Sequence, residues 1–315
     1  MIVCGDLHLK NKQPFLSAAK NFFDWIDEKY PDDELVLLGD IFDTSSPQWE
    51  IFSLFAEFVR SRNSYVYILE GNHTYSKIKG SVLEGLGNVS NVKQYLIPNT
   101  IGLDMLCLPF LTIDNKKYYE NEFNFIPNDF DFIFTHLSPK ECSWGNEGID
   151  FDKVNLRGTY IHGHIHMQSE FKDIHENRHI VLGVPFPTRH GEHLQEHRIA
   201  RITNKEIEFI KVPQFFIYET IEFGQEPSSS NNILNIKNAT SWEIVYEKYK
   251  KYYIREEGVE FVKKEGNLEF EQKEFEGSSL KQKFKIFQLD RRLPKEVSEK
   301  CFEYIDKYEN LAEEK

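Results

Sequence analysis

Cysteine and long apolar runs are both scarce in this chain of 315 residues. Its four cysteines are scattered and include no C-x-x-C pair, so reduced thiols in a cytoplasmic protein are the simplest interpretation. No apolar run approaches the roughly 18 residues that are needed to span a membrane. The chain starts directly with a strand-like segment and shows no signal peptide. We therefore expect a cytoplasmic protein without membrane contact.

Positive charge is also in short supply. The sequence has 38 Lys and Arg against 51 Asp and Glu, which gives a formal net charge of -13. Nonspecific affinity for nucleic acids comes mainly from Lys and Arg, so we expect the chain alone to bind them weakly. With 40% hydrophobic and 28% charged residues the composition is that of an ordinary globular protein. Its length allows one large domain or two.

Five short motifs rich in Asp, Asn and His follow one another in a fixed order. They are Asp6-Leu7-His8, Gly39-Asp40-Ile41-Phe42-Asp43, Gly71-Asn72-His73, Thr135-His136 and Gly163-His164-Ile165-His166. The motifs begin within a residue or two of the ends of short apolar runs, such as residues 1–4 and 34–38, that are typical of buried strands. Ligands gather at the carboxyl ends of strands in open α/β sheets, so we expect the motifs to converge on one site.

Helix-like stretches separate the early motifs. Residues 14–29 carry apolar side chains on one helical face, and residues 47–60 form a second such stretch. The order strand, motif, helix, strand is typical of an α/β layered domain. The predicted fold class is therefore α/β.

The residue types of the motifs suit a centre that holds two divalent metal ions. Hydrolysis of a phosphodiester needs a hydroxide in line with the leaving oxygen and charge neutralisation on the phosphate oxygens, and two metals about 3.5 to 4 Å apart provide both. Carboxylates lower the net charge and bridge the ions, whereas imidazoles favour Mn, Fe or Zn over Mg or Ca. The motifs contain three Asp, one Asn and five His. They therefore predict a two-metal phosphoesterase site.

The ordered motifs resemble those of the calcineurin-like metallophosphoesterase superfamily, over roughly residues 1–200. Within it, the chain resembles the SbcD-type DNA recombination and repair nucleases, including the small subunit of phage recombination endonucleases. A phage origin would place the chain in the host cytoplasm. This finer resemblance rests on the second motif without a following Arg-Gly, on residues 183–188 followed by Gly191-Glu192 and a strand, and on the C-terminal tail. The resemblance implies a two-sheet sandwich flanked by helices, with a smaller C-terminal cap or helical region.

The resemblance also implies which residues hold the metals. One metal would be bound by Asp6, His8, Asp40 and His166. The second would be bound by Asp40, Asn72, His136 and His164, so that Asp40 bridges the two. Manganese is the metal expected first, with Mg, Fe and Zn as the other candidates. A hydroxide between the metals would be the nucleophile. His73 would be the catalytic histidine, not a ligand, that steadies the transition state or protonates the leaving oxygen, and Asp43 would orient a ligand or loop.

Two residues near the motifs need separate interpretation. The family usually has Asp or Glu after the histidine of the third motif, but Thr74 stands there in this chain. An acid at that position could tune His73 or its loop, so the departure bears on the pKa and position of His73 and removes no metal ligand. His162, two residues before the proposed ligand His164, is predicted to be structural or to support a ligand.

A second histidine pattern indicates a different chemistry. Residues 193–197 fit the H-x-x-E-H pattern of inverted zinc proteases. That pattern needs a helix to bring both histidines to one face, but the run lies between Gly191 and the strand-like residues 198–203. A surface loop or hairpin is therefore the preferred interpretation, and activity that survives substitution of Glu196 would exclude the protease.

The second half of the chain is expected to contain a domain boundary. Residues 206–212 and 215–223 are strand-like and could finish a sheet of the catalytic domain, whereas residues 224–232 are rich in turn and polar residues, as in a linker. We therefore predict three parts. They are a nuclease domain over residues 1–224, a cap-like region over residues 225–290 and a helical tail over residues 291–315.

Helix-like segments in this region carry apolar stripes. Residues 241–257 have aromatic residues at helical spacing, and Pro294 could begin another helix with an apolar face. Packing within their own domain and docking on a partner explain such stripes equally well. The resemblance implies an SbcC-type SMC-like ATPase as that partner. Between the helices, basic and aromatic residues mix over residues 281–292, where a solvated strand face is preferred to a nucleic-acid contact.

These observations lead to one predicted function and two alternatives. The chain is predicted to be a two-metal-dependent DNA nuclease subunit, with 3′ to 5′ exonuclease and single-strand or hairpin endonuclease action in DNA end processing, repair or recombination. It could also form a homodimer. A small-molecule phosphoesterase, such as a cyclic-nucleotide phosphodiesterase, would use the same metal site. A noncatalytic scaffold is disfavoured because all seven proposed ligands are present.

Overall fold

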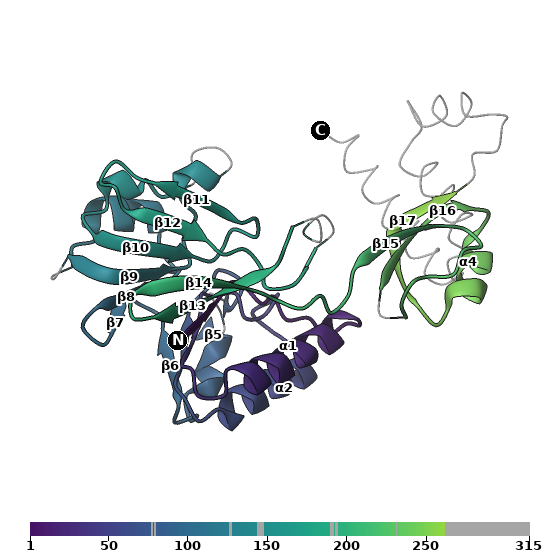
Figure 1. Cartoon of the computed structure of the whole chain (residues 1–315), viewed down its shortest axis with the longest axis horizontal. Coiled ribbons are helices and arrows are strands. Elements are labelled where there is room, and N and C mark those ends of the chain that lie inside the picture. The colour runs from purple at the N-terminus through teal and green to yellow at the C-terminus, as the bar shows by residue number, and fades with distance from the viewer. Residues whose placement is uncertain are drawn as a thin grey trace, which may run out of the picture. The chain divides into compact units, whose positions relative to one another are not determined.

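The described part of this chain contains two six-stranded sheets, a three-stranded sheet and a short two-stranded sheet (Figure 1). The computed structural model describes residues 1–76, 78, 80–125, 128–143, 148–189, 192, 195–230 and 232–261. Predictions for residues 262–315 lie outside the described residues. They concern the second part of the cap-like region, the basic and aromatic segment and the helical tail.

The first sheet has four parallel strands, flanked at one edge by an antiparallel hairpin. Its strand order is β14 (Glu206–Lys211), β13 (Arg198–Thr203), β1 (Ile2–Cys4), β2 (Leu35–Leu37), β3 (Val66–Leu69) and β6 (Val92–Tyr95). Side chains alternate between the two faces, so Ile2 and Cys4 pack on the helical side and Val3 packs on the side of the second sheet. The strands predicted from the apolar runs of this region are confirmed.

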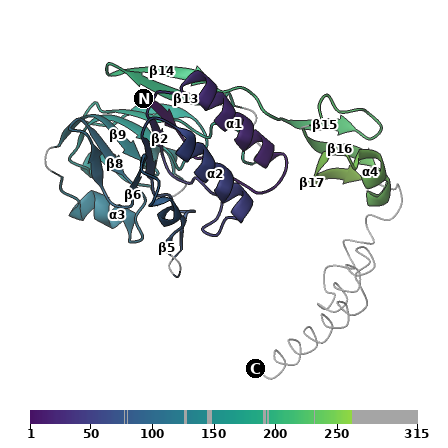
Figure 2. The same cartoon turned by 90° about the horizontal axis from the view of Figure 1, so that it is seen from below.

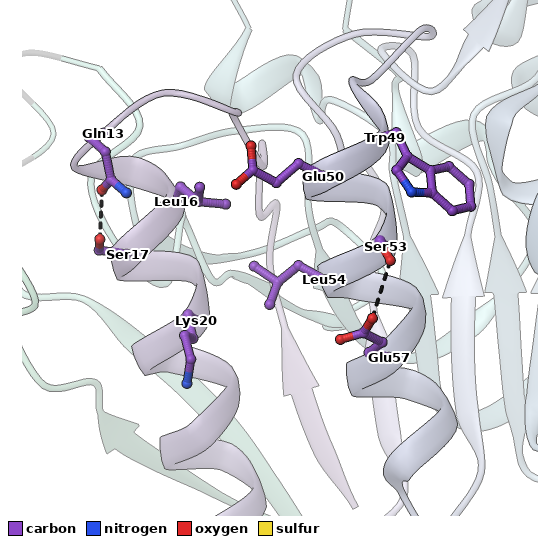
Figure 3. Close-up of a pocket in the computed structure, with 9 residues that line it drawn as sticks. All are labelled: Gln13, Leu16, Ser17, Lys20, Trp49, Glu50, Ser53, Leu54 and Glu57. Atoms are coloured by element: carbon purple, nitrogen blue, oxygen red, sulfur yellow. Dashed lines mark hydrogen bonds between the residues drawn. The ribbon is translucent and has the colours of Figure 1, made fainter.

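Two helices cover the outer face of the first sheet and lie side by side (Figures 1 and 2). They are α1 (Phe15–Lys29) and α2 (Trp49–Ser61), as the helical spacing predicts. The ring of Phe23 in α1 stacks on that of Phe58 in α2, with centroids 4.2 Å apart. On the solvent side, Leu16 and Leu54 point into the groove between the helices (Figure 3).

The second sheet packs against the inner face of the first. Its strand order is β11 (Ser169–Lys172), β12 (Arg178–Val181), β10 (Arg157–His162), β9 (Asp129–Thr135), β8 (Met105–Leu108) and β7 (Asn99–Ile101). Val36 and Leu38 of the first sheet share a buried cluster with Phe134 and Ile161 of the second. The prediction of a two-sheet α/β sandwich is therefore confirmed.

Short elements fill the connections. They are β4 (Tyr75–Ser76), β5 (Gly80–Ser81), η1 (Val82–Leu86), α3 (Asn115–Lys117), η2 (Tyr118–Glu122), η3 (Lys140–Cys142) and η4 (Phe151–Lys153). Among these elements, η2 and η4 cover the outer face of the second sheet, since Tyr119 of η2 and Phe151 of η4 are buried in one cluster with Ile133 of β9.

The third sheet corrects two expectations. It contains β15 (Tyr218–Glu222), β16 (Ile233–Ala239) and β17 (Tyr253–Phe261), with α4 (Trp242–Tyr249) packed on it. Because β15 pairs with β16, the expectation that residues 215–223 finish a sheet of the catalytic domain is wrong, and residues 224–232 connect two paired strands. The helix predicted over residues 241–257 ends at Tyr249, since the later residues enter β17. The division of the chain into three parts stays a prediction.

The expectations of reduced cysteines and of no membrane-spanning segment can be compared with the described residues. Cys4, Cys107 and Cys142 are free thiols. Within the described part of the chain, no helix has both the length and the apolar composition that crossing a bilayer requires.

Candidate metal centre

The five motifs meet at one edge of the sandwich. Three of them follow strands of the first sheet, where β1 leads to Asp6 and His8, β2 to Asp40, and β3 to Asn72 and His73. The other two follow strands of the second sheet, where β9 leads to His136 and β10 to His164 and His166. The predicted convergence at the carboxyl ends of strands is thus observed, and it involves both sheets.

Asp40 lies in the middle of this cluster. Its Oδ2 atom is 3.3 Å from His136 Nε2 and 3.6 Å from His8 Nε2, and its Oδ1 accepts a 2.8 Å hydrogen bond from the His73 backbone N–H. Three groups of side chains have ligand atoms close enough to hold an ion together. They are Asp6 with His8 and His166, His8 with Asp40 and His73, and Asp40 with His136 and His164. This position supports the bridging role proposed for Asp40.

Asn72 and His166 complete the two predicted ligand sets. Asn72 Oδ1 lies 3.1 Å from His136 Nε2 and 2.9 Å from His164 Nδ1. His166 Nε2 lies 3.0 Å from His8 Nε2 and 3.8 Å from an Asp6 carboxylate oxygen. All seven residues predicted as ligands are therefore brought together, although their roles as ligands stay a prediction.

The cluster fits divalent cations. Asp6 is only 1% exposed, and its Oδ2 has no hydrogen-bond partner within the described residues. A buried polar atom left without a partner costs about 1–3 kcal/mol, more when charged. Imidazole nitrogens and carboxylate oxygens together are the donors that Mn, Fe and Zn accept, so a cation would satisfy this carboxylate.

The ligand loops adopt unusual backbone conformations. Positive φ angles occur at His8 (42°), Asp40 (42°) and His164 (68°). This left-handed region is unfavourable for residues other than glycine and is found where the surrounding structure enforces it. Glycines provide the space, because a Cβ atom at Gly39 would overlap the His136 ring and one at Gly71 would overlap the Asp40 carboxylate.

Burial and neighbouring charges shift the pKa values of the centre. Burial raises the pKa of Asp6. Burial acts in the same direction on Asp40, but the charges of His136 and His8 outweigh it and hold the pKa of Asp40 below its usual value. Burial opposes the protonation of His136, yet the Asp40 and Asp6 carboxylates raise its pKa to about 9. In His164, burial dominates and lowers the pKa to about 3. Protons on His136 would be displaced when a cation binds.

Hydrogen bonds to groups outside the centre determine which ring nitrogen of His136 and of His166 faces the centre. His136 Nδ1 donates to the Leu38 carbonyl at 2.7 Å, which leaves Nε2 for the centre. His166 Nδ1 lies 2.5 Å from Glu192 Oε1 and likewise leaves Nε2. This arrangement, in which an acceptor fixes a histidine that binds a metal, is common in metal sites.

Glu192 is the residue for which sequence reasoning proposed no role. Its Oε2 accepts hydrogen bonds from the backbone N–H groups of Thr188 at 2.6 Å and Arg189 at 2.9 Å. Burial tends to raise the pKa of Glu192, but the hydrogen bond with His166 and these backbone bonds lower it to about 2. The carboxylate therefore stays charged and holds the His166 ring. The signal in the sequence was the acid after Gly191.

Replacing Glu192 by glutamine is expected to weaken Mn binding about 10- to 100-fold, because the His166 ring loses its charged partner. Isothermal titration with Mn measures this affinity. Glu196→Gln is the matched control, since that side chain is 61% exposed and pairs with Lys211. Wild-type affinity in Glu192→Gln would contradict the role given to Glu192.

His73 and Asp43 lie together beside the cluster. His73 Nδ1 donates to the Asp43 backbone carbonyl at 2.9 Å, which fixes the ring and leaves Nε2 to give or take a proton. Asp43 Oδ1 is 3.4 Å from His8 Nδ1. Asp43 thus contacts two of the loops that carry the motifs, in agreement with the orienting role expected for it.

Thr74 is explained by its neighbour Glu70. The Thr74 hydroxyl contacts the Glu70 carboxylate and accepts a 3.3 Å hydrogen bond from the Gly71 backbone N–H, and Thr74 is fully buried. Burial raises the pKa of Glu70. An acid in place of Thr74 would repel Glu70, so the threonine secures the loop of Asn72 and His73 without adding buried charge.

His162 lies outside the cluster, which agrees with a structural role. Its Nδ1 is 2.9 Å from Thr135 Oγ1, and its Nε2 is 2.9 Å from His179 Nδ1. The two rings stack with an interplanar angle of 13°. This buried pair joins β10 to β9 and β12 just before the ligand loops begin.

Stability is expected to fall as the pH drops below about 6.5. Burial, together with the charge of His179, lowers the pKa of His162 well below its usual 6.5, and burial also lowers the pKa of His179. Below pH 6.5 the unfolded chain therefore binds more protons than the folded chain and is favoured, on the order of 1 kcal/mol for each buried histidine by pH 5.

Urea unfolding between pH 7.5 and pH 5 measures this dependence. His162→Gln removes one of the buried histidines whose pKa is lowered and should flatten the curve. A curve as steep as that of the wild-type protein would contradict the assignment to His162.

The H-x-x-E-H pattern does not form a helical zinc site in the described residues. His193 lies outside them. Glu196 is exposed and pairs with Lys211 at 2.7 Å, whereas His197 is buried and its Nδ1 donates to the Val184 carbonyl at 2.8 Å. Both residues lie in a loop just before β13. The geometry disfavours a metallopeptidase.

A sequence comparison decides the family. The model of the calcineurin-like phosphoesterase family matches residues 1–168, which contain all five motifs. This chain belongs to the calcineurin-like phosphoesterase family. Calcineurin-like phosphoesterases are hydrolases with centres of two metals, and the clustered residues of this phosphoesterase could hold such ions.

Comparison with other proteins adds only a distant likeness. An archaeal phosphodiesterase is 12% identical with a TM-score of 0.39, over 67% of this phosphoesterase and 98% of that chain. A dimetal phosphatase from Danio rerio is 13% identical with a TM-score of 0.37, over 67% of this phosphoesterase and 97% of that chain. Neither value supports an argument about substrate. No curated protein matches significantly.

Proposed function

We propose that this phosphoesterase is a two-metal-dependent DNA nuclease subunit. It would act as a 3′ to 5′ exonuclease on duplex ends and as an endonuclease on single strands or hairpins, in DNA end processing, repair or recombination. The observation that carries the proposal is the pair of overlapping ligand groups at the sheet ends, which share Asp40. Their motifs resemble those of the calcineurin-like superfamily. The finer resemblance to the SbcD-type nucleases comes from the missing Arg-Gly after the second motif, from residues 183–188 with Gly191-Glu192, and from the C-terminal tail.

The proposed ligands and His73 would have different roles in hydrolysis. Bound divalent ions, Mn first among the candidates, would activate water and neutralise charge on the phosphate. The seven proposed ligands would hold these ions. His73, fixed through Nδ1 by the Asp43 carbonyl, would deliver a proton from Nε2 to the leaving oxygen.

Cationic side chains beside the centre support a polyanionic substrate. Lys10 Nζ donates to the Thr188 carbonyl at 2.9 Å and lies 3.5 Å from Asp43 Oδ1. Arg189 lines the cavity over the centre, and Lys116 lines the neighbouring one. In a chain with a net charge of -13, this local gathering of basic side chains suits the phosphates of a nucleic-acid strand.

A partner protein would provide most of the affinity for DNA. The net negative charge leaves the chain with weak nonspecific affinity for nucleic acids, so an SbcC-type SMC-like ATPase is the proposed partner. Its docking site would be the predicted helical tail, residues 291–315. Deletion of residues 290–315 should abolish copurification with a cognate ATPase, and unchanged copurification would contradict docking. Homodimer formation stays a prediction.

A hydrolysis assay tests the function. The purified chain is incubated with Mn and end-labelled duplex DNA, with and without a candidate ATPase, and in a separate reaction with Mn and a cyclic nucleotide. Asp40→Asn is the inactive control. We expect stepwise release of nucleotides from 3′ ends. Hydrolysis of cyclic nucleotides, with no DNA cleaved in any combination, would favour the small-molecule phosphoesterase.

A further inference from the structure

A second cavity lies beside the metal centre. It encloses about 430 Å³, and its lining includes Asn72 and His164 of the centre. The cavity directly over the centre shares these two residues with it, and also Cys142 and Ile165. A group attached to a phosphate at the centre could therefore extend into this second cavity, which we call the side cavity.

An aromatic ring forms one wall of the side cavity. The Phe110 ring is nearly parallel to the His164 ring, at 22° and 6.4 Å between centroids, and stands edge-on to the His136 ring. The Phe110 backbone N–H donates to the Glu70 carbonyl at 3.0 Å, so this ring is tied to the strand end that precedes the third motif. The remaining apolar wall consists of Leu137, Ile149 and Ile165.

Hydroxyl groups complete the lining. Ser143 Oγ donates to the Pro139 carbonyl at 2.8 Å, so Ser138 is the donor in the 2.5 Å contact between the two serine hydroxyls. Both oxygens keep lone pairs that can accept a hydrogen bond from a ligand. Among the described lining residues, Lys116 is the one cationic side chain and no carboxylate is present. The side cavity therefore suits a flat, neutral group with a polar edge.

We propose that the side cavity binds a nucleobase next to the scissile phosphate, stacked on Phe110. The inference rests on the proposed nuclease function and names the part of DNA that the site recognises. Nucleobases stack on aromatic side chains with little regard to sequence, and their edges would meet the serine hydroxyls. The volume of about 430 Å³ lies in the range of small-ligand pockets. A base held there has left the duplex stack, which favours frayed ends and single strands as substrates.

Abasic DNA tests the proposal. Two end-labelled oligonucleotides differ only at the two nucleotides that flank the last phosphodiester, which carry bases in one and are abasic in the other. With Mn, the wild-type protein should show at least about a tenfold higher kcat/KM on the substrate that carries bases. Phe110→Ala should bring this ratio close to one, and Phe110→Trp should restore it.

Tyr65→Ala provides the matched control. Tyr65 is an exposed aromatic residue at the opposite end of β3 from the centre, so its loss should leave the wild-type ratio unchanged. A wild-type ratio near one would overturn the nucleobase inference and leave the nuclease function standing, because DNA would still be hydrolysed.

If no DNA is cleaved, the nuclease function is contradicted. A binding measurement can then still test the side cavity as a nucleobase site. Cys142 lines the side cavity, whereas Cys4 and Cys107 are buried, so alkylation of Cys142 by N-ethylmaleimide reports occupancy. Peptide mass spectrometry measures the rate. With Mn present, deoxyadenosine monophosphate should slow alkylation about fivefold more than inorganic phosphate does, and Phe110→Ala should remove this difference.

Each outcome decides one of the proposals. Stronger protection by the nucleotide without DNA hydrolysis would sustain the side cavity as a nucleobase site in a phosphoesterase that acts on small nucleotides. Equal protection by the nucleotide and by phosphate would overturn it.

Discussion

Asp40→Asn is expected to reduce Mn-dependent phosphodiester hydrolysis by at least about a thousandfold, or about 4 kcal/mol of transition-state stabilisation. The Asp40 carboxylate lies 3.3 Å from His136 and 3.6 Å from His8, and it belongs to two of the three groups that could hold an ion. Asparagine keeps the size of the side chain but removes the charge that both ions would share. The measurement is kcat/KM for a diester substrate at several Mn concentrations.

The same substitution has a readout that does not depend on activity. An ion that binds only the folded chain stabilises it by roughly 2.7 kcal/mol at a hundredfold excess over Kd, which raises Tm by several degrees. Asp40→Asn should lose most of this Mn-dependent rise. Asp24→Asn should keep it, since Asp24 is 63% exposed and pairs with Lys20 on the surface of α1. A full rise in Asp40→Asn would contradict the bridging position.

His73→Ala is expected to lower kcat by about 10²- to 10⁴-fold while Mn affinity stays within about twofold of the wild-type value. The reason is that His73 would serve as a proton donor, with its Nδ1 held by the Asp43 carbonyl. The position alone leaves a second role open, because His73 also forms a group with His8 and Asp40 that could hold an ion.

Calorimetric titration of His73→Ala with Mn distinguishes these roles. His175→Ala is the matched control, since it removes an exposed histidine outside the centre. Loss of Mn affinity in parallel with activity would make His73 a ligand instead of a proton donor.

Local patterns explain why the catalytic sandwich is predictable from sequence. In β1, Ile2 and Cys4 pack on the helices while Val3 packs on the second sheet, so a short apolar run is enough to identify a strand buried on both faces. Residues 215–223 show a similar pattern, but the strand within them, β15 (Tyr218–Glu222), belongs to another sheet. Their partner, β16, follows a polar loop, and the pattern within a strand does not specify its neighbour.

The residues of the site can be predicted from the sequence only where they lie within a recognisable motif. The seven proposed ligands and His73 stand in recognisable motifs, and the structure brings them together. Glu192 follows Gly191 in a recognisable pair, but the pair does not reveal its role, because its contact with His166 joins a loop after β12 to a loop after β10. The contact between Thr74 and Glu70 could not be predicted from the sequence either, since only folding brings the two side chains together.

The meeting of the two sheets at the centre has a mechanical consequence. Each proposed ligand set takes carboxylate or amide oxygens from loops of the first sheet and imidazoles from loops of the second. Bound ions would therefore act as clamps that hold the two layers together along one edge, while the apolar cluster between the sheets holds the rest. Chelation would release that edge first, and backbone amides near the ends of β2 and β9 would exchange with deuterium sooner than those in the middle of either sheet.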